Sequence, residues 1–202
     1  VPEADYYNPA DSVLKDKNKQ GNFDLAARYK YFNRWGHVQL AGIFRRIDYV
    51  HKNEMDNLYG WGVLLSTVIN INKKNVIYSQ YSIGESIANY YVGFKDRQLD
   101  AIYDPIADNM VPKLIQGGFI TYTYIFNLTW RFSTTGGISY IDDFEFESPT
   151  TFKTSRYFAA NFFYYPIETI NLGIEYTTGR RTNIDDKFGS ATRISMIGIF
   201  SF

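Results

Sequence analysis

The sequence predicts an all-β chain whose strands form the wall of an antiparallel transmembrane β-barrel. Residues 22–202 divide into runs in which apolar and polar side chains alternate, as strands with one lipid-facing side require. The connections between these runs alternate between short turns and longer polar stretches, which is typical of periplasmic turns and outer loops. Aromatic residues make up 18% of the chain, which suits strands and the aromatic belts at membrane interfaces.

The overall composition agrees with this fold class. No apolar run reaches the roughly 18 residues of a membrane helix, and the mean hydropathy is that of a soluble protein. A barrel wall reconciles these facts, because only alternate residues face lipid while the loops and lumen carry charge. The 202 residues include 21 basic and 21 acidic side chains, and this neutrality argues against nucleic acid as a partner. The chain has no cysteine, which excludes disulfides and thiolate metal sites.

The alternation predicts nine strands, taken here in chain order. Residues 1–21 lack sustained alternation and contain two prolines, so we expect them to form an extracellular loop ahead of the barrel portion, 22–202. Short turns are predicted at residues 33–36, 72–74, 127–129 and 166–169, and longer loops at 49–57, 95–115, 142–155 and 179–191. The predicted strands cover residues 22–32, 37–45, 58–71, 75–84, 116–126, 130–141, 156–165, 170–179 and 192–202.

The odd number of strands predicts that the chain is the C-terminal part of a larger barrel. A single-chain bacterial barrel usually has an even number of strands with both ends in the periplasm. If Phe202 ends in the periplasm, the first of nine strands also descends, and residues 1–21 lie outside the cell. The alternative is a small closed barrel with a tenth strand hidden in residues 1–21 or 86–94.

Alternate residues of each predicted strand point to opposite faces, and one of these two sets contains several basic side chains. If the apolar parity faces lipid, we expect the pore to be lined by Arg28, Lys30, Arg45, Arg131 and Arg193. The carboxylates at wall positions are fewer, namely Asp24 and Glu175. Rings of Arg or Lys select for anions, so the sequence predicts an anion-preferring diffusion channel. The alternative is that these residues pair with lumen acids and only solvate the interior.

The residue types needed for catalysis or metal binding are sparse. The chain has only two histidines, His37 and His51, and no Ser-His-acid, metal-ligand or phosphate-loop spacing, so we predict no enzyme, cofactor or metal site. An enzymatic barrel, or a structural or binding barrel with a plugged lumen, is the alternative function. Four loop acids that resemble calcium ligands are interpreted as solvated side chains: Asp104, Asp108, Asp185 and Asp186.

Three segments resemble the DcaP-like outer-membrane porins of Gram-negative bacteria. They are GHVQLAGIFRRIDY (36–49), YGWGVLLS (59–66) and LGIEYTTGRRTNIDDKFGSATRISMIGIFSF (172–202). The resemblance implies a homotrimer of sixteen-stranded channels in the outer membrane, passing dicarboxylates and related small anions. It also implies a pore role for Arg45 and a pore-mouth position for Arg180 and Arg181, which could instead anchor a loop or bind lipopolysaccharide.

Overall fold

Nine strands form a single antiparallel sheet in the computed structural model, which describes residues 6–7, 23–51, 54–91, 93–94, 97, 99–167 and 169–201. Each strand pairs with the next along the chain, except that β5 pairs with β8. The all-β prediction and all nine predicted wall strands are confirmed. The strands are β2 (Leu25–Asn33), β3 (Gly36–His51), β4 (Glu54–Asn70), β5 (Asn75–Glu85), β8 (Leu114–Ile125), β9 (Trp130–Ile141), β10 (Phe152–Ile167), β11 (Ile170–Asn183) and β12 (Phe188–Phe200).

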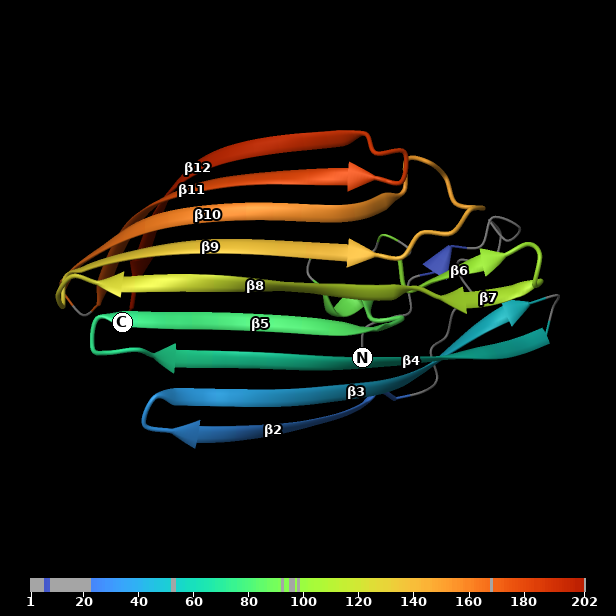
Figure 1. Cartoon of the computed structure of the whole chain (residues 1–202), viewed down its shortest axis with the longest axis horizontal. Helices are drawn as coiled ribbons and strands as arrows, with labels where there is room; N and C mark the ends of the chain where they lie inside the picture. The colour runs from blue at the N-terminus through green and yellow to red at the C-terminus, as the bar shows by residue number, and fades with distance from the viewer. Residues whose placement is uncertain are drawn as a thin grey trace.

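The connections between the strands differ at the two ends of the sheet. The turns that join β2 to β3, β4 to β5, β8 to β9 and β10 to β11 lie at one end, on the left in Figure 1. The β3–β4, β5–β8, β9–β10 and β11–β12 connections lie at the other end. We refer to these as the turn end and the loop end. This arrangement agrees with the short and long connections predicted from the sequence.

All four predicted loops at the loop end are too long, because the strands continue into them; β8 begins at Leu114 and β10 at Phe152. The β3–β4 ladder runs to the pair His51 and Glu54, inside the predicted loop 49–57. The β11–β12 ladder runs to Thr182 and Phe188, inside the predicted loop 179–191. Backbone hydrogen bonding does not require an apolar face, so the ladders extend beyond the point where the apolar alternation stops.

The predicted loop 95–115 also contains regular structure. It carries β6 (Ala101–Asp104) and β7 (Asn109–Pro112), which form a three-stranded sheet with β1 (Tyr6–Tyr7). The 3-10 helix η2 (Ala88–Tyr90) lies just before this loop, within residues 86–94, where the small-barrel alternative places a tenth strand. The rest of the predicted extracellular loop, residues 1–5 and 8–21, lies outside the described part of the chain.

The described residues of 86–113, which we call the inner segment, fold back onto one face of the curved sheet (Figure 1). We call this face the inner face. The largest buried cluster lies there, and it joins the inner segment to the wall. Its members are Ile87, Ala88, Phe94, Leu99, Ile115, Ile141 and Phe152.

The outer face is apolar and exposed, the reverse of a soluble sheet. Large apolar side chains that point away from the inner face are exposed, among them Leu40, Phe44, Leu65, Ile120, Ile174 and Met196. A lipid-facing wall has this pattern, with its polar and packed groups turned to the interior. In the described part of the chain, no helix is long and apolar enough to cross a membrane.

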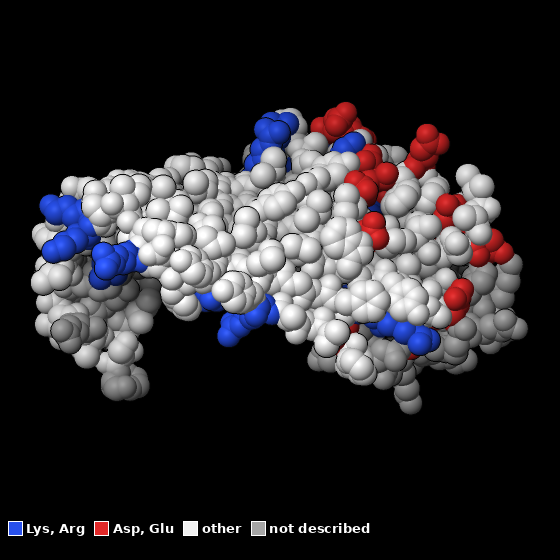
Figure 2. Space-filling model, turned by 60° about the horizontal axis from the view of Figure 1, so that its bottom comes forward, with Lys and Arg blue, Asp and Glu red and all other residues white. Residues whose placement is uncertain are grey.

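Acidic side chains are concentrated at one end of the molecule. Figure 2 shows them gathered over the loop end, whereas basic side chains lie at the tip of the turn end, midway along the molecule and beside the acidic groups, on the face drawn. The turn-end residues include Arg34, Lys73 and Lys74, which lie in the β2–β3 and β4–β5 turns. The chain is neutral overall, but its charged side chains are unevenly distributed along the strand direction.

Candidate functional site

The strand register brings all five predicted pore-lining residues to the inner face. Arg28 pairs with Ala41 and Lys30 with Gln39, so both share a face with Arg45 on β3. Arg131 on β9 and Arg193 on β12 fall on the same face through the successive ladders from β4 to β12. The ladders therefore place these five residues on one face of the sheet, as the alternation predicts.

Arg45 does not present its charge to the open face, contrary to the expectation that it lines the pore. Its side chain is 0% exposed and forms an ion pair from Nη1 to Oδ2 of Asp100 at 3.3 Å. Its Nε lies 3.7 Å from Oδ1 of Asp24, and Nη1 donates a hydrogen bond to the Ser86 carbonyl oxygen at 2.9 Å. The inner segment supplies Asp100 and Ser86, so its folding onto the wall is what encloses the guanidinium.

Asp100 connects this ion pair to η2. Its second oxygen, Oδ1, accepts a hydrogen bond from the backbone N–H of Ala88 at 2.7 Å. The Arg45 guanidinium also lies 5.5 Å from the centroid of the Tyr90 ring. A fully buried carboxylate that bridges a wall arginine and a helix backbone fixes both elements relative to each other.

Tyr90 completes the same cluster from η2. Its hydroxyl donates a hydrogen bond to Oδ2 of Asp24. Burial and this hydrogen bond raise the pKa of the Tyr90 hydroxyl far above its ordinary value, so the side chain stays neutral. Arg45, Asp24, Asp100 and Tyr90 together form a closed polar cluster, which we call the Arg45 cluster.

A second buried ion pair anchors the other end of the inner segment. Nζ of Lys113 contacts Oε1 of Glu147 in the β9–β10 connection, and the two side chains are only 1% and 3% exposed. The Lys113 backbone donates to the Asp100 carbonyl at 3.2 Å and accepts from the Ser86 N–H at 3.1 Å. The inner segment is therefore tied to the wall at both of its ends.

The other four predicted pore-lining cations remain accessible. Arg193 has 72% of its side chain exposed and lies 3.7 Å from the Glu175 carboxylate. Arg131 and Lys30 lie over aromatic rings, at 4.6 Å from Tyr165 and 4.8 Å from Phe32. Arg28, Lys30 and Arg131 are exposed and form no ion pair with a described residue, so their charges can act on a solute.

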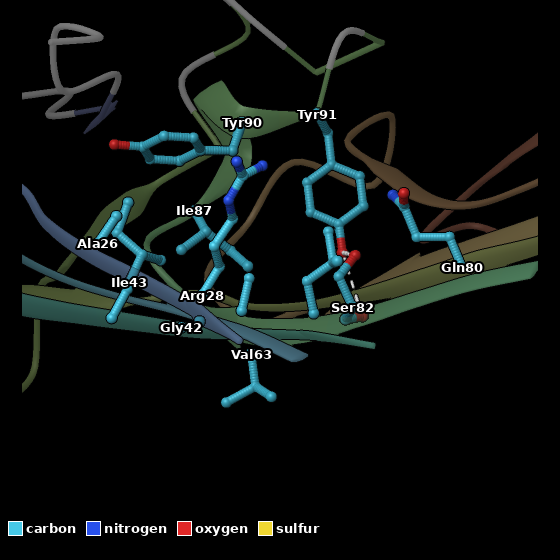
Figure 3. A pocket seen from close by; sticks show the side chains of 14 residues that line it. Ala26, Arg28, Gly42, Ile43, Val63, Gln80, Ser82, Ile87, Tyr90 and Tyr91 are labelled. Atoms are coloured by element: carbon cyan, nitrogen blue, oxygen red, sulfur yellow. Dashed lines mark hydrogen bonds between the residues drawn. The ribbon is translucent and has the colours of Figure 1, made fainter. Parts of the chain in front are cut away.

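A cavity of about 500 Å³ lies beside Arg28, between the inner segment and the wall (Figure 3). Arg28 rises from the wall towards Tyr90 and Tyr91, which hang from the inner segment on either side of it (Figure 3). The Tyr91 hydroxyl hydrogen-bonds with the Ser82 hydroxyl at 2.6 Å, which holds its ring in place. Most of the remaining lining is small or apolar: Ala26, Ala27, Ala41, Gly42, Ile43, Gly62, Val63, Leu64 and Ile87. The cavity therefore combines the positive charge of Arg28 with a mostly apolar lining.

The two consecutive arginines at the predicted pore mouth point to opposite faces. Arg181 is on the inner face, where its Nη2 donates to the Thr150 carbonyl at 3.3 Å and its Nε to Oδ1 of Asn183 at 2.9 Å. Arg180 is on the outer face, with its guanidinium 3.6 Å from the centroid of the Phe188 ring. Arg181 thus holds the β9–β10 connection, while Arg180 points away from the inner face.

Several residues of this site were not singled out from the sequence. Asp100, Tyr90, Lys113 and Glu147 all lie in connections, where no strand period indicates which side chains turn inward. One available signal was Asp100 itself, since it stands between Leu99 and the apolar pair Ala101-Ile102. Within the described ranges, no group of three or more His, Asp or Glu residues could hold a metal ion.

A family model and a solved structure point to the same family. The family model described as DcaP outer membrane protein matches residues 11–202. The crystal structure of the outer membrane channel DcaP of Acinetobacter baumannii superposes with a TM-score of 0.79 at 18% sequence identity, covering 91% of this chain and 53% of that chain. The NanC porin structure superposes with a TM-score of 0.48 at 12% identity, covering 89% of this chain and 93% of that chain. No curated protein matches the sequence. The chain spans about half the length of the solved A. baumannii channel.

Proposed function

Because the chain belongs to the DcaP outer membrane protein family, we propose that it forms part of a passive diffusion channel that prefers small anions such as dicarboxylates. The predicted family resemblance is confirmed, and the protein resides in the outer membrane of a Gram-negative bacterium. The anion preference is our inference from the inner face. Passage requires no catalysis, and the site is built for electrostatic attraction rather than bond chemistry.

The single observation that carries this proposal is the surplus of accessible cations on the inner face. Arg28, Lys30 and Arg131 have no ion-pair partner among the described residues, and Arg193 is largely exposed despite its contact with Glu175. Arg and Lys at a pore wall attract anions, and Arg binds carboxylates through two parallel hydrogen bonds. Exposed cations that are spread over three strands also allow a solute to move between weak contacts, as conduction requires.

The proposed assembly is a trimer of sixteen-stranded barrels, with further strands joining β2 and β12. In the described sheet these two strands are the edges, and they are not paired with each other. Unpaired backbone groups are too costly to leave in hydrocarbon, so we propose that other strands of the same barrel cover both edges. The partners of this assembly are small anionic solutes in the pore, and membrane lipid with lipopolysaccharide around the wall.

A barrel with a plugged lumen is the second candidate, and the inner segment favours it. This segment is fixed on the inner face by the Arg45 cluster and by the Lys113–Glu147 pair. A segment anchored in this way narrows the lumen. If the segment leaves a passage open, the barrel is a channel. If the segment closes the passage, the barrel has a binding or structural role.

Liposome swelling with the full-length barrel separates the two candidates. We expect faster swelling with a small dicarboxylate than with an uncharged solute of similar size, and Arg28→Gln should reduce this preference. Arg34→Gln in the β2–β3 turn is the matched control and should leave it unchanged. Absence of swelling with every solute would support a plugged barrel, and equal rates for both solutes would contradict the anion preference.

A further inference from the structure

Two arginines stand directly opposite each other on the outer face, away from the lumen. Arg156 on β10 pairs with Arg180 on β11, and both side chains are exposed. Like charges at directly opposed positions of an antiparallel pair repel each other. Neither guanidinium forms a hydrogen bond or ion pair with a described residue, although Arg180 lies over the Phe188 ring. The pair therefore forms a concentrated positive site without a protein counter-charge in the described chain.

The surroundings of the pair change from polar to apolar along the strands. Arg156 lies near the start of β10 and Arg180 near the end of β11, both towards the loop end. Ser190 stands opposite Arg180, and the neighbouring Thr178 and Thr192 hydroxyls are 3.2 Å apart. Further towards the turn end, the same face carries large apolar side chains, namely Phe162, Ile174 and Met196. This is the order expected where a lipid headgroup region meets hydrocarbon.

An apolar groove of about 570 Å³ runs across the outer face and reaches Arg156. Its lining includes Leu65, Tyr81, Ile120 and Ile138, and Gly136 leaves a gap between them. A Cβ atom added at Gly136 would meet no atom within 4 Å, so the groove is open at this point. An apolar groove that ends at two cations is complementary to a lipid with an anionic headgroup and an acyl chain.

We propose that the Arg156–Arg180 pair binds a phosphate group of lipopolysaccharide, and that the groove holds one of its acyl chains. This inference rests on the proposed orientation, in which the loop end faces the outer leaflet. Arg binds phosphate through bidentate, charge-assisted hydrogen bonds, and two facing guanidinium groups supply such donors from both sides. The outward residues of β10, β11 and β12 include no carboxylate in the described ranges, so this part of the wall offers the pair no complementary charge.

The test uses the full-length barrel extracted in mild detergent and titrated with purified deep-rough lipopolysaccharide, observed by native mass spectrometry. Wild-type protein should retain the lipid, and Arg156→Gln with Arg180→Gln should weaken its binding by about tenfold or more, as expected for the loss of two charge-assisted contacts. Lipid A from which the phosphates have been removed should bind wild type and the double variant equally. Gly136→Leu should weaken binding by filling the groove while both arginines remain.

Matched controls keep this proposal separate from the channel proposal. Arg34→Gln with Lys74→Gln removes two charges at the turn end and should leave lipid binding unchanged. The double arginine variant should keep the wild-type reversal potential in a salt gradient, because its substitutions are outside the lumen. Unchanged lipopolysaccharide retention by the double variant would overturn the proposal. Loss of the oligomer with retained lipid would also overturn it, and would assign the pair to a subunit interface.

Discussion

At the level of single residues, the difference between Arg28 and Arg45 lies in what surrounds each charge. Both occupy inward positions on adjacent strands. Arg45 is enclosed by Asp24 and Asp100 and has no exposed surface, whereas Arg28 projects into a cavity with no ion-pair partner in the described chain. The sequence predicts that both side chains point to the same face of the sheet. Their roles could not be predicted, because Asp100 lies 55 residues after Arg45 in a connection without periodicity.

Reversing the accessible charges should reverse the selectivity of the pore. In the full-length barrel, Arg28→Glu with Arg131→Glu replaces two accessible cations with carboxylates, and we expect selectivity to shift towards cations. Permeability ratios from reversal potentials measure this shift. Arg156→Glu, on the outer face, is the control and should leave the ratio near that of wild type. An unchanged ratio in the double variant would show that the narrowest part of the pore lies elsewhere.

Removing the Arg45 charge should release the inner segment. Arg45→Met removes the guanidinium that forms ion pairs with the enclosed carboxylates of Asp24 and Asp100, and breaking a buried ion pair typically costs about 3–5 kcal/mol. We expect faster hydrogen exchange across residues 86–113 and a larger single-channel conductance, while the wall strands stay protected. Lys30→Met is the exposed counterpart and should cause neither change. Protection of the segment equal to wild type would exclude the Arg45 cluster as its anchor.

At the level of elements, the strands were easier to predict than the segments between them. Alternation identifies a strand because one face must be apolar, as for Leu172, Ile174 and Tyr176 of β11. It fails at the ends of β11 and β12, where the ladder continues through polar residues to Thr182. It also fails for β6 and β7, which are only four residues long. Short strands leave too few residues for a period to be detected.

The β2–β3 turn depends on Gly36. Its φ of +137° is strained for any residue with a side chain, and an added Cβ would lie 1.9 Å from the Val68 carbonyl oxygen. Gly36→Ala should therefore lower the temperature at which the folded barrel loses its anomalous gel mobility, with a cost of at least about 1–3 kcal/mol. Gly189→Ala, where no atom lies within 4 Å of the added Cβ, should leave that temperature unchanged. Equal behaviour of the two variants would contradict this account of the turn.

The β9–β10 connection should loosen in acid. A hydrogen bond from Lys153 holds the pKa of Asp143 below its ordinary value of 3.8. Because the folded pKa is lower than the unfolded one, the stabilisation is complete above the unfolded pKa and is lost as pH falls through the folded pKa. Hydrogen exchange in residues 142–151, corrected for its intrinsic pH dependence, should accelerate as the pH is lowered from 5 to below about 3. Asp143→Asn should abolish most of this acceleration, and a pH response unchanged by the substitution would contradict the role of the Asp143–Lys153 pair.

At the scale of the whole molecule, the sheet has two chemically different faces. The outer face is exposed and apolar, with the Arg156–Arg180 pair towards the loop end, whereas the inner face carries most of the wall's cations and the inner segment. The two faces follow from the two parities of the sequence, so this division was predictable. The position of the inner segment on the inner face was not predictable, because it depends on contacts that lie outside the strand period. It requires the Arg45–Asp100 and Lys113–Glu147 pairs, which join distant parts of the chain.

The reversal potential of the wild-type, full-length barrel in a salt gradient tests the central claim most directly. The accessible cations Arg28, Lys30, Arg131 and Arg193 predict a potential with the sign of anion selectivity, and a smaller magnitude at high salt as the charges are screened. A potential near zero, or one with the sign of cation selectivity, would contradict the account of a basic lumen.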